Sequence, residues 1–345
     1  MKIQKSFVLI SLLLVLVSEA LSAGTNHDDP KWFQRPSWNA FISQSAIYSS
    51  DYNFLSQSDD ALSFDMWEAG LLFSTDIISE ITFSSQLLGR QVSRSSGNDL
   101  RVDYAFFSYS FYRSMHDAIG VRIGRIRSSY GFYNETRDIP HTRTGIVMPQ
   151  SIYFDMTRNS FYSADGIEFF GYKDFGDERF SAQIFISKPL EDDDEAAEAS
   201  QLQPRNLNGD QSLLAKISYG SEFDGVRAAF TYYRPEYEVG VTDFQVSPGS
   251  FVSDENASFY SESMLSSIEY NQLDWSITAE YLRHKFQPTV TSIKLPLYEE
   301  SFYIQGLYRF NDQFESYLRY DTTSPHTSAS VDKAYKWSDI NVGAT

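Results

Sequence analysis

Short segments in which apolar and polar residues alternate recur along most of the chain. In the segment 178–188, ERFSAQIFISK, one face carries phenylalanine, alanine and two isoleucines, and the other carries mostly arginine, serine and glutamine. A period of two places successive side chains on opposite faces of an extended strand, whereas a helical period fits none of these segments. The pattern therefore predicts β-strands, and the other clear examples are 79–90, 117–124, 211–220, 224–234, 273–282 and 300–310.

The connections between the predicted strands alternate in length. Joins of two to four residues, such as the one between 64–75 and 79–90, alternate with long connections. Short turns at one end of the strands and long loops at the other are typical of outer-membrane β-barrels. A soluble sandwich also has hairpins and variable loops, but regular alternation over about fourteen strands favours the barrel. The long connections are 48–63, 91–100, 128–164, 189–210, 235–257, 287–299 and 322–333.

Residues 1–23 have the features of a secretory signal peptide. Lys2 and Lys5 precede an almost wholly apolar run over residues 6–17, and small residues follow at the spacing that a signal peptidase needs, with cleavage near residues 20–23. The alternatives are a buried helix or a membrane anchor, but about 12 apolar residues are too few to span a bilayer. The chain contains no cysteine, so a lipid attached to an N-terminal cysteine is excluded.

Composition narrows the class of protein further. The 345 residues carry a formal net charge of −18, which excludes a general nucleic-acid binder. Aromatic residues make up 16% of the chain, mean hydropathy is negative, and no second long apolar run follows the first. A chain without helical spans crosses a membrane only as a closed β-barrel, in which every backbone polar group finds a partner on a neighbouring strand.

One stretch also resembles a known family. Residues 121–140, VRIGRIRSSYGFYNETRDIP, have a Gly-Arg strand end followed by a glycine-aromatic-asparagine-glutamate loop. In this stretch and in its strand and loop alternation, the chain resembles Gram-negative outer-membrane porins, most nearly the phosphate-selective porin-like group. The resemblance covers most of residues 37–345 and implies an all-β fold: a transmembrane antiparallel barrel of about 16 strands over residues 24–345, with one loop folded into the pore.

The same resemblance implies a location and partners. It predicts export to the outer membrane of a Gram-negative cell, insertion by the barrel-assembly machinery, contact with membrane lipid and lipopolysaccharide, and a homotrimer. Porins of this kind usually finish on a strand with a terminal aromatic residue, whereas this sequence finishes WSDINVGAT. Because an open strand edge is not tolerated in lipid, we infer that a further hairpin follows residue 345.

The longest connection, 128–164, is the best candidate for the constriction loop of the predicted pore. It follows the fifth predicted strand, and it concentrates arginine in a chain that otherwise has more acids. Rings of charged side chains at a narrowing set which ions pass. The alternative is an external loop whose charges face water. The candidate residues are the positive Arg122, Arg125, Arg127, Arg137 and Arg143, the opposing Glu135 and Asp138, and the neighbouring His141.

These patterns predict a passive diffusion porin for small hydrophilic solutes, anions among them. No nucleophile motif, metal-binding histidine spacing or phosphate-binding glycine loop is present in the sequence, so we expect no enzymatic activity and no cofactor. A barrel hydrolase and a surface receptor or adhesin with long binding loops are the rival classes. Conductance in planar bilayers would separate the channel from both rivals.

Overall fold

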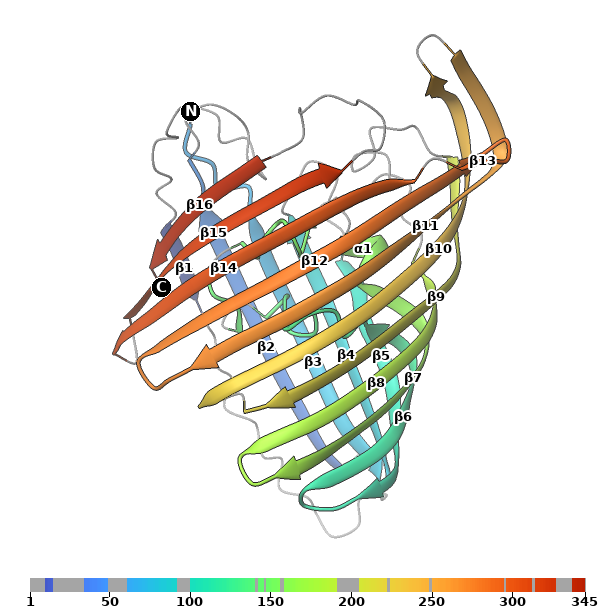
Figure 1. The fold of residues 1–345 in the computed structure, drawn as a ribbon. Helices are drawn as coiled ribbons and strands as arrows, with labels where there is room; N and C mark the ends of the chain where they lie inside the picture. Colours follow the sequence, from blue (N-terminus) through green and yellow to red (C-terminus); the bar gives the residue numbers. More distant parts are fainter. Residues whose placement is uncertain are drawn as a thin grey trace.

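The structure is a single antiparallel sheet of sixteen strands that curves strongly on itself, with one short helix in the part of the chain that it describes (Figure 1). It is a computed structural model. The described residues are 10–14, 34–48, 61–91, 100–139, 142–145, 147–155, 158–190, 205–221, 224–247, 250–294, 296–311, 314–326 and 337–344.

The strands follow one another around the sheet in chain order, and each pairs antiparallel with the next. The short β13 pairs only with β12, so β14 is the next strand of the sheet. Among the described residues, β1 and β16 are the two edges. The elements are β1 (Ile10–Leu14), β2 (Gln34–Ala46), β3 (Trp67–Ile78), β4 (Ile81–Gln91), β5 (Leu100–Arg113), β6 (Asp117–Arg127), α1 (Arg158–Phe161), β7 (Ser163–Phe175), β8 (Glu178–Pro189), β9 (Arg205–Gly220), β10 (Gly225–Ser247), β11 (Ser250–Asn271), β12 (Trp275–Val290), β13 (Ile293–Lys294), β14 (Leu297–Asn311), β15 (Phe314–His326) and β16 (Trp337–Ala344).

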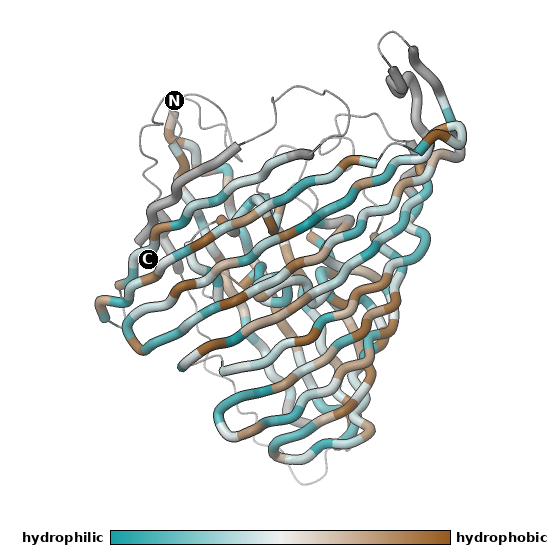
Figure 2. The backbone as a smooth tube through the Cα atoms, viewed as in Figure 1, coloured by the Kyte–Doolittle hydropathy of each residue, from teal (hydrophilic) through white to brown (hydrophobic). Residues whose placement is uncertain are grey.

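Polarity is inverted relative to a soluble protein. Along β14, Ile304 is 43% exposed and its neighbour Gln305 is 4% exposed. Along β10, Phe230 is 42% exposed and Thr231 is fully buried. Figure 2 shows the same alternation of hydrophobic and hydrophilic positions along the long strands. Because successive side chains point to opposite faces, the sheet has an apolar outer face and an inner face that buries polar side chains.

The all-β prediction is confirmed, and each strand predicted from alternation overlaps an observed strand, although the bounds differ. Several predicted long connections are partly strand, among them 287–299, which contains the end of β12, all of β13 and the start of β14. The largest difference lies in 235–257. Residues 235–257 were expected to form a long loop, but β10 and β11 continue through them, with paired positions as far as Ser247 and Ser250. Pro235 lies inside β10 opposite Ser212, where the neighbouring register is also interrupted. A proline in a strand usually indicates an edge or a bulge, which is why the sequence favoured a loop.

The two chain ends bear on predictions that the structure leaves open. Within the predicted signal peptide, residues 1–23, only β1 is described, and it pairs with Ile42–Ala46 of β2. The cleavage site stays a prediction, as does the further hairpin after residue 345. At the other edge, β16 pairs with β15 over eight positions. No helix among the described residues is long and apolar enough to cross a membrane.

Candidate functional site

The segment between β6 and β7, residues 128–162, is the candidate site, and we call it the inner loop. Figure 1 shows it in green within the curve of the sheet. Its hydrogen bonds and ion pairs reach the inner faces of strands from both halves of the sheet, among them β3, β9, β12 and β15. The segment is therefore attached across the interior, far from its own hairpin.

The inner loop brings its own apolar core into the sheet. Tyr130, Met148, Ile152, Tyr153 and Tyr162 are all at most 7% exposed. They pack in one cluster with buried side chains from eight strands. Burial of this apolar surface favours the docked loop over a loop in water. The strand residues of the cluster are Ile126, Ala164, Phe185, Leu214, Tyr233, Leu265, Leu282 and Tyr303.

Glu280 of β12 is the centre of the first polar anchor. The hydroxyl of Tyr153 donates a 2.6 Å hydrogen bond to its carboxylate, and the backbone N–H of Phe132 donates another at 3.1 Å. Ser267 and Tyr303, from the neighbouring strands, donate the remaining two, at 2.5 and 2.9 Å. A buried carboxylate with four donors satisfies its hydrogen-bonding capacity, so this contact holds the loop in one position.

The glycine and asparagine of the sequence motif have specific structural roles. Gly131 has a φ of +59°, and a Cβ there would lie 2.1 Å from the Tyr153 hydroxyl oxygen. Only glycine fits this position without displacing the anchor. The side-chain amide of Asn134 donates to the carbonyl oxygens of Ser128 and Tyr162 at 2.6 and 3.1 Å. Asn134 thereby ties together the two ends of the inner loop.

Further hydrogen bonds attach the loop to other strands. Lys216 of β9 donates to the carbonyl oxygen of Gly131 at 2.7 Å, and Arg319 of β15 donates to that of Val147 at 3.1 Å. The hydroxyl of Tyr133 donates to the Glu269 carboxylate of β11 at 3.1 Å. Charged side chains of three different strands thus accept or donate at the loop, which fixes its path across the interior.

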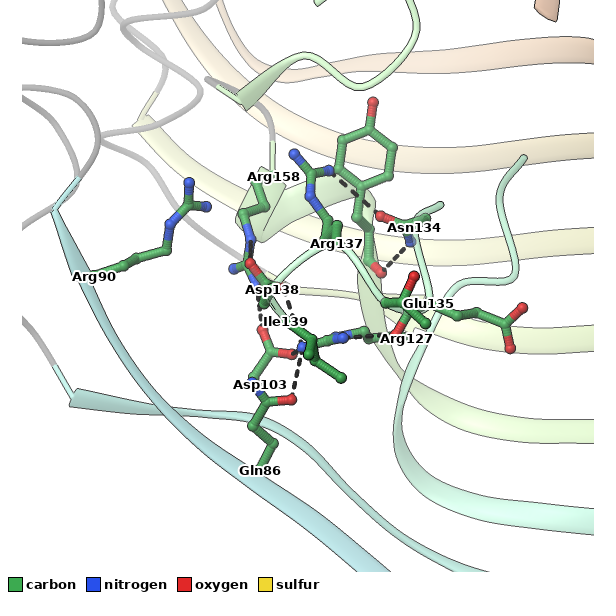
Figure 3. Close-up of polar contacts among 12 residues, drawn as sticks. Gln86, Arg90, Asp103, Arg127, Asn134, Glu135, Arg137, Asp138, Ile139 and Arg158 are labelled. Carbon is green, nitrogen blue, oxygen red and sulfur yellow. Dashed lines mark hydrogen bonds and ion pairs between the residues drawn. The ribbon is translucent and has the colours of Figure 1, made fainter. Parts of the chain in front are cut away.

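Two groups of buried ion pairs complete the attachment. The first, the rim cluster, joins Arg127 and Arg158 to Asp103 and Asp138 (Figure 3). Arg127 lies 2.5 Å from Asp103 and 3.1 Å from Asp138, and Arg158 contacts the same two carboxylates. Arg127 also donates to the side chain of Gln86 at 2.8 Å. All four charged residues are buried, so each depends on the others for compensation.

The second group, the central cluster, joins three arginines to two carboxylates. Arg137 lies 2.9 Å from Asp155, and Arg143 pairs with Glu68 of β3. Arg90 of β4 lies between them, 3.1 Å from Asp155 and 3.5 Å from Glu68. Their side chains are at most 9% exposed. The loop arginines are therefore paired with carboxylates instead of presenting free positive charge.

The pairing shifts the titration of the two loop carboxylates. Burial by itself would raise the pKa of Asp155, but Arg90 and Arg137 outweigh burial and hold this pKa below its usual range. The same balance applies to Asp138, where burial is opposed chiefly by Arg127 and Arg90, and the pKa is again lowered. Both carboxylates therefore stay ionised at neutral pH.

The structure brings four of the eight sequence-predicted site residues into the two clusters. Arg127, Arg137, Asp138 and Arg143 belong to the two clusters. The side chain of Glu135 is 36% exposed, with a carboxylate oxygen 3.5 Å from the Nζ of Lys216. His141 falls outside the described residues, so its predicted position in the pore stays a prediction.

Two other predicted residues lie apart from the clusters. Arg122 lies on the inner face of β6, where it pairs with Glu168 at 2.6 Å and its guanidinium carbon lies 4.6 Å from the ring centroid of Phe170. Arg125 pairs with Asp165 at 2.9 Å, and their side chains are 33% and 51% exposed. Its register continues the outer face of β6, so the structure separates Arg125 from the inner loop.

Sequence reasoning missed the main partners of the loop arginines. Asp103 compensates arginine charge in the rim cluster, and Asp155 does so in the central cluster. Arg158 of α1 is as buried as the arginines that were predicted. Asp103 lies in a predicted strand region, but the β4–β5 register shifts between Gln86 and Leu87, and this irregularity hides its face from simple alternation. Nothing in the sequence distinguished Tyr153 from the other tyrosines, so its role in the loop could not be predicted.

Chemically, the arrangement is a polar interior in which five arginines face four carboxylates in the two clusters. The described parts of the chain contain no group of three or more histidine, aspartate or glutamate side chains placed to hold a metal ion. The carboxylates in the two clusters and at Glu280 are all held by donors or arginines. Such a site can restrict and orient solutes by size and hydrogen bonding.

Comparison with known proteins supports the fold. No family model matches the sequence, and no curated protein matches it. The outer-membrane expressed OmpT of Vibrio cholerae aligns with a TM-score of 0.54 and 11% identity, over 90% of this chain and 81% of that chain. A loop L8 deletion mutant of the same protein aligns with a TM-score of 0.52 and 11% identity, over 90% and 87%. The chain has the fold of outer-membrane β-barrel proteins.

A weaker likeness adds nothing to this conclusion. An anion-selective porin from Comamonas acidovorans aligns over 90% of this chain and 96% of its own, with 9% identity and a TM-score of 0.38. At these identities the likeness shows the fold alone, so function has to be argued from the site.

Proposed function

We propose that the protein is an outer-membrane channel through which small hydrophilic solutes diffuse. The observation that carries the proposal is the inverted polarity of the sheet. Apolar side chains such as Ile304 and Phe230 are exposed on the outer face, while Glu68, Glu280 and Gln305 are buried on the inner face. An outer face of this kind suits lipid, and a polar interior suits a water-filled passage.

The inner loop sets the width of this passage in our proposal. It occupies part of the interior and is attached to both halves of the sheet through Glu280, Lys216, Arg319 and the central cluster. A loop held at so many points narrows the interior permanently instead of opening and closing freely. Solutes then pass between the loop and the part of the inner face that it leaves uncovered.

Charge selectivity follows from the paired arginines. The sequence suggested a constriction in which the arginines outnumber the opposing Glu135 and Asp138, so that anions would be favoured. In the structure, Arg137 and Arg143 contact Asp155 and Glu68, so their fields are largely cancelled at a distance. We therefore propose that solute size and polarity limit passage more than the sign of charge, with anions among the solutes that pass.

The proposal also includes a cellular setting and an assembly. We propose export by the predicted signal peptide, insertion into the outer membrane of a Gram-negative cell by the barrel-assembly machinery, and a homotrimer in contact with lipid and lipopolysaccharide. These elements rest on the sequence resemblance to porins. In lipid the two edges of the sheet must find partners, because unpaired strand edges are too costly there. The proposal includes no catalytic activity.

Reconstitution in planar lipid bilayers tests this function. The folded protein should insert and produce stepwise increases in current at a constant voltage. Heat-modifiable migration on a gel would show that the added protein is folded. Folded protein that inserts into the bilayer and produces no current steps would contradict the proposal.

A surface receptor is the second candidate, and one observation favours it. The hairpin of β10 and β11 is paired as far as Ser247 and Ser250, but the pairing of β9 with β10 ends at Gly240, and that of β12 with β11 begins at Ser258. Figure 1 shows the hairpin projecting beyond the other strands. Deletion of residues 241–254 should leave the current steps unchanged if the hairpin is an external binding surface, and alter them if it shapes the channel mouth.

A further inference from the structure

The wall of the sheet splits between β5 and β6 at the end that carries the inner loop. Their pairing ends at Ala105 and Arg125, although β5 continues to Leu100 along β4 and β6 continues to Arg127 along β7. Beyond Ala105, arginine side chains bridge the two strands in place of backbone hydrogen bonds. Arg125 donates to the carbonyl oxygen of Val102 at 3.4 Å, and Arg127 donates to the Asp103 carboxylate at 2.5 Å.

A cavity of about 420 Å³ occupies this split. Four basic and two acidic side chains contribute to its lining, so the charge of the lining is +2 (4 − 2 = +2). The excess is notable in a chain whose formal net charge is −18. A volume in this range accommodates a small ligand or a headgroup. The charged lining residues are Arg101, Asp103, Arg125, Arg158, Asp165 and Lys188.

The mouth of the cavity lies on the outer face of the sheet. Arg125 is two positions after Ile123, and Lys188 is two positions after Ile186, and both isoleucines are exposed on the apolar outer face. Alternation therefore places Arg125 and Lys188 at the end of the rows that face lipid. Charged side chains replace apolar ones at this end of the outer face. The phosphate headgroups of a membrane contact a barrel at the ends of its apolar outer face, so they would meet Arg125 and Lys188.

The floor of the cavity belongs to the rim cluster. Asp103 and Arg158 line it, and Arg158 also holds Asp138 of the inner loop. The outer ion pair is the exchangeable part. Arg125 donates two hydrogen bonds to Asp165, at 2.9 and 3.0 Å, but the two side chains are 33% and 51% exposed, so an anion from the headgroup layer can reach the pair and compete for it. A phosphate can therefore replace Asp165 as the partner of Arg125, because the guanidinium group is suited to two parallel hydrogen bonds with phosphate oxygens.

We propose that this cavity is a binding site for a phosphate monoester, presented by the headgroup of a lipid in the membrane around the barrel. Arg125 and Lys188 bind the phosphate at the mouth, and the headgroup extends over Asp103 and Arg158. The site lies on the outer wall and is separate from the proposed passage. It rests on the proposed placement of the barrel in the outer membrane. Free phosphate shares the same chemistry, so the test includes it as a separate arm.

Native mass spectrometry of the refolded protein in detergent micelles tests the proposal. The probes are lipid A, lipid A with its phosphates removed, and inorganic phosphate. Wild-type protein should retain lipid A, and removal of the phosphates should weaken retention about tenfold, because each charge-assisted hydrogen bond contributes more than a neutral one. The double variant Arg125→Gln and Lys188→Gln should show a similar loss for intact lipid A.

A matched variant controls for charge alone. Lys173→Gln with Arg179→Gln also removes two positive charges, here from the turn end of the β7–β8 hairpin, where Arg179 pairs with Asp174, away from Arg125 and Lys188. This variant should retain lipid A like the wild type. Gel migration without heating shows whether each variant is folded.

The possible outcomes separate the sources and the claims. Retention of inorganic phosphate but not lipid A, lost in the Arg125 and Lys188 variant, would assign the site to a free anion. Equal retention of lipid A by wild type and the Arg125 and Lys188 variant would overturn the proposal. Current steps of the wild-type protein from the same preparation test the channel function independently.

Discussion

Tyr153 and Glu280 are 127 positions apart in the sequence, and the Tyr153 hydroxyl donates a 2.6 Å hydrogen bond to the Glu280 carboxylate. Both residues are buried. The contact joins the inner loop to β12, on the side of the sheet away from the loop's own strands. This one contact therefore attaches the loop to a strand that is distant from β6 and β7.

Tyr153→Phe should loosen this attachment without unfolding the barrel. The variant leaves a buried carboxylate with one donor fewer, which costs about 1 to 3 kcal/mol of loop docking. Single-channel recordings should show greater open-channel noise than the wild type. Tyr219→Phe is the control, because Tyr219 is exposed on the outer face and bonds to Glu178. Identical noise in both variants would show that the Tyr153 contact does not hold the loop.

Opposite charge changes in the central cluster should have opposite effects on ion selectivity. Arg137→Gln with Arg143→Gln leaves Glu68 and Asp155 compensated by Arg90 alone, so cations should gain permeability. Glu68→Gln with Asp155→Asn leaves three arginines without carboxylates, so anions should gain. The reversal potential in a salt gradient measures both. Shifts in the same direction, or no shift in either variant, would contradict a passage beside this cluster.

The pH response of the loop follows from Asp138 and Asp155. Their pKa values are lowered in the folded protein, so their ionised form stabilises the docked loop at every pH above the unfolded value, about 3.9. This contribution is lost only as the pH falls below about 4 and through the lower folded pKa. The part of the open-channel noise that depends on these two carboxylates should therefore stay constant from pH 7 to about pH 5 and rise only in stronger acid.

Asp155→Asn should reproduce the acid state at neutral pH. The variant removes the charge that Arg90 and Arg137 compensate, so its noise at pH 7 should resemble that of the wild type in acid. A wild-type transition centred near pH 6 that Asp155→Asn abolishes would mean that the pKa of this carboxyl is raised in the folded protein, against the arrangement of charges around it.

The two faces of β10 should differ in their tolerance of polar and apolar residues. Phe230 is 42% exposed on the outer face, and Phe230→Arg should cost about 2 to 4 kcal/mol if it lies near the middle of the membrane. Thr231 is fully buried on the inner face, and its hydroxyl has no hydrogen-bond partner among the described residues, so Thr231→Val should be tolerated. Urea unfolding in lipid vesicles measures both. Equal costs would show that the register is wrong.

Alternation alone was enough to predict the faces of the strands. Phe180, Ile184, Phe230 and Ile304 were all expected on the outer face, and all are exposed. This works because a strand has a fixed period of two, so each residue's face follows from its neighbours. The method failed at residues 235–257. A proline usually interrupts a strand, but Pro235 lies inside β10, which pairs with β9 and with β11 on either side of this residue.

The partners of the loop arginines could not be predicted in the same way. A cluster of arginines in residues 121–143 is visible in the sequence, but Glu68, Asp103 and Asp155 meet it only after the sheet has curved and the loop has turned inward. Ion pairs between distant segments depend on the path of the loop, which has no period. The arginines were therefore predicted as candidate residues, while their compensation required the structure.

The central claim is that the inner loop narrows a channel, and single-channel conductance tests it most directly. A variant in which a short glycine–serine linker replaces residues 131–150 loses the contacts with Lys216, Glu68 and Arg319 and the Phe132 contact with Glu280, while Tyr153 keeps its own. If the loop fills the passage, a folded barrel of this variant should show current steps severalfold larger than the wild type. Current steps of unchanged size from a folded barrel would contradict the account.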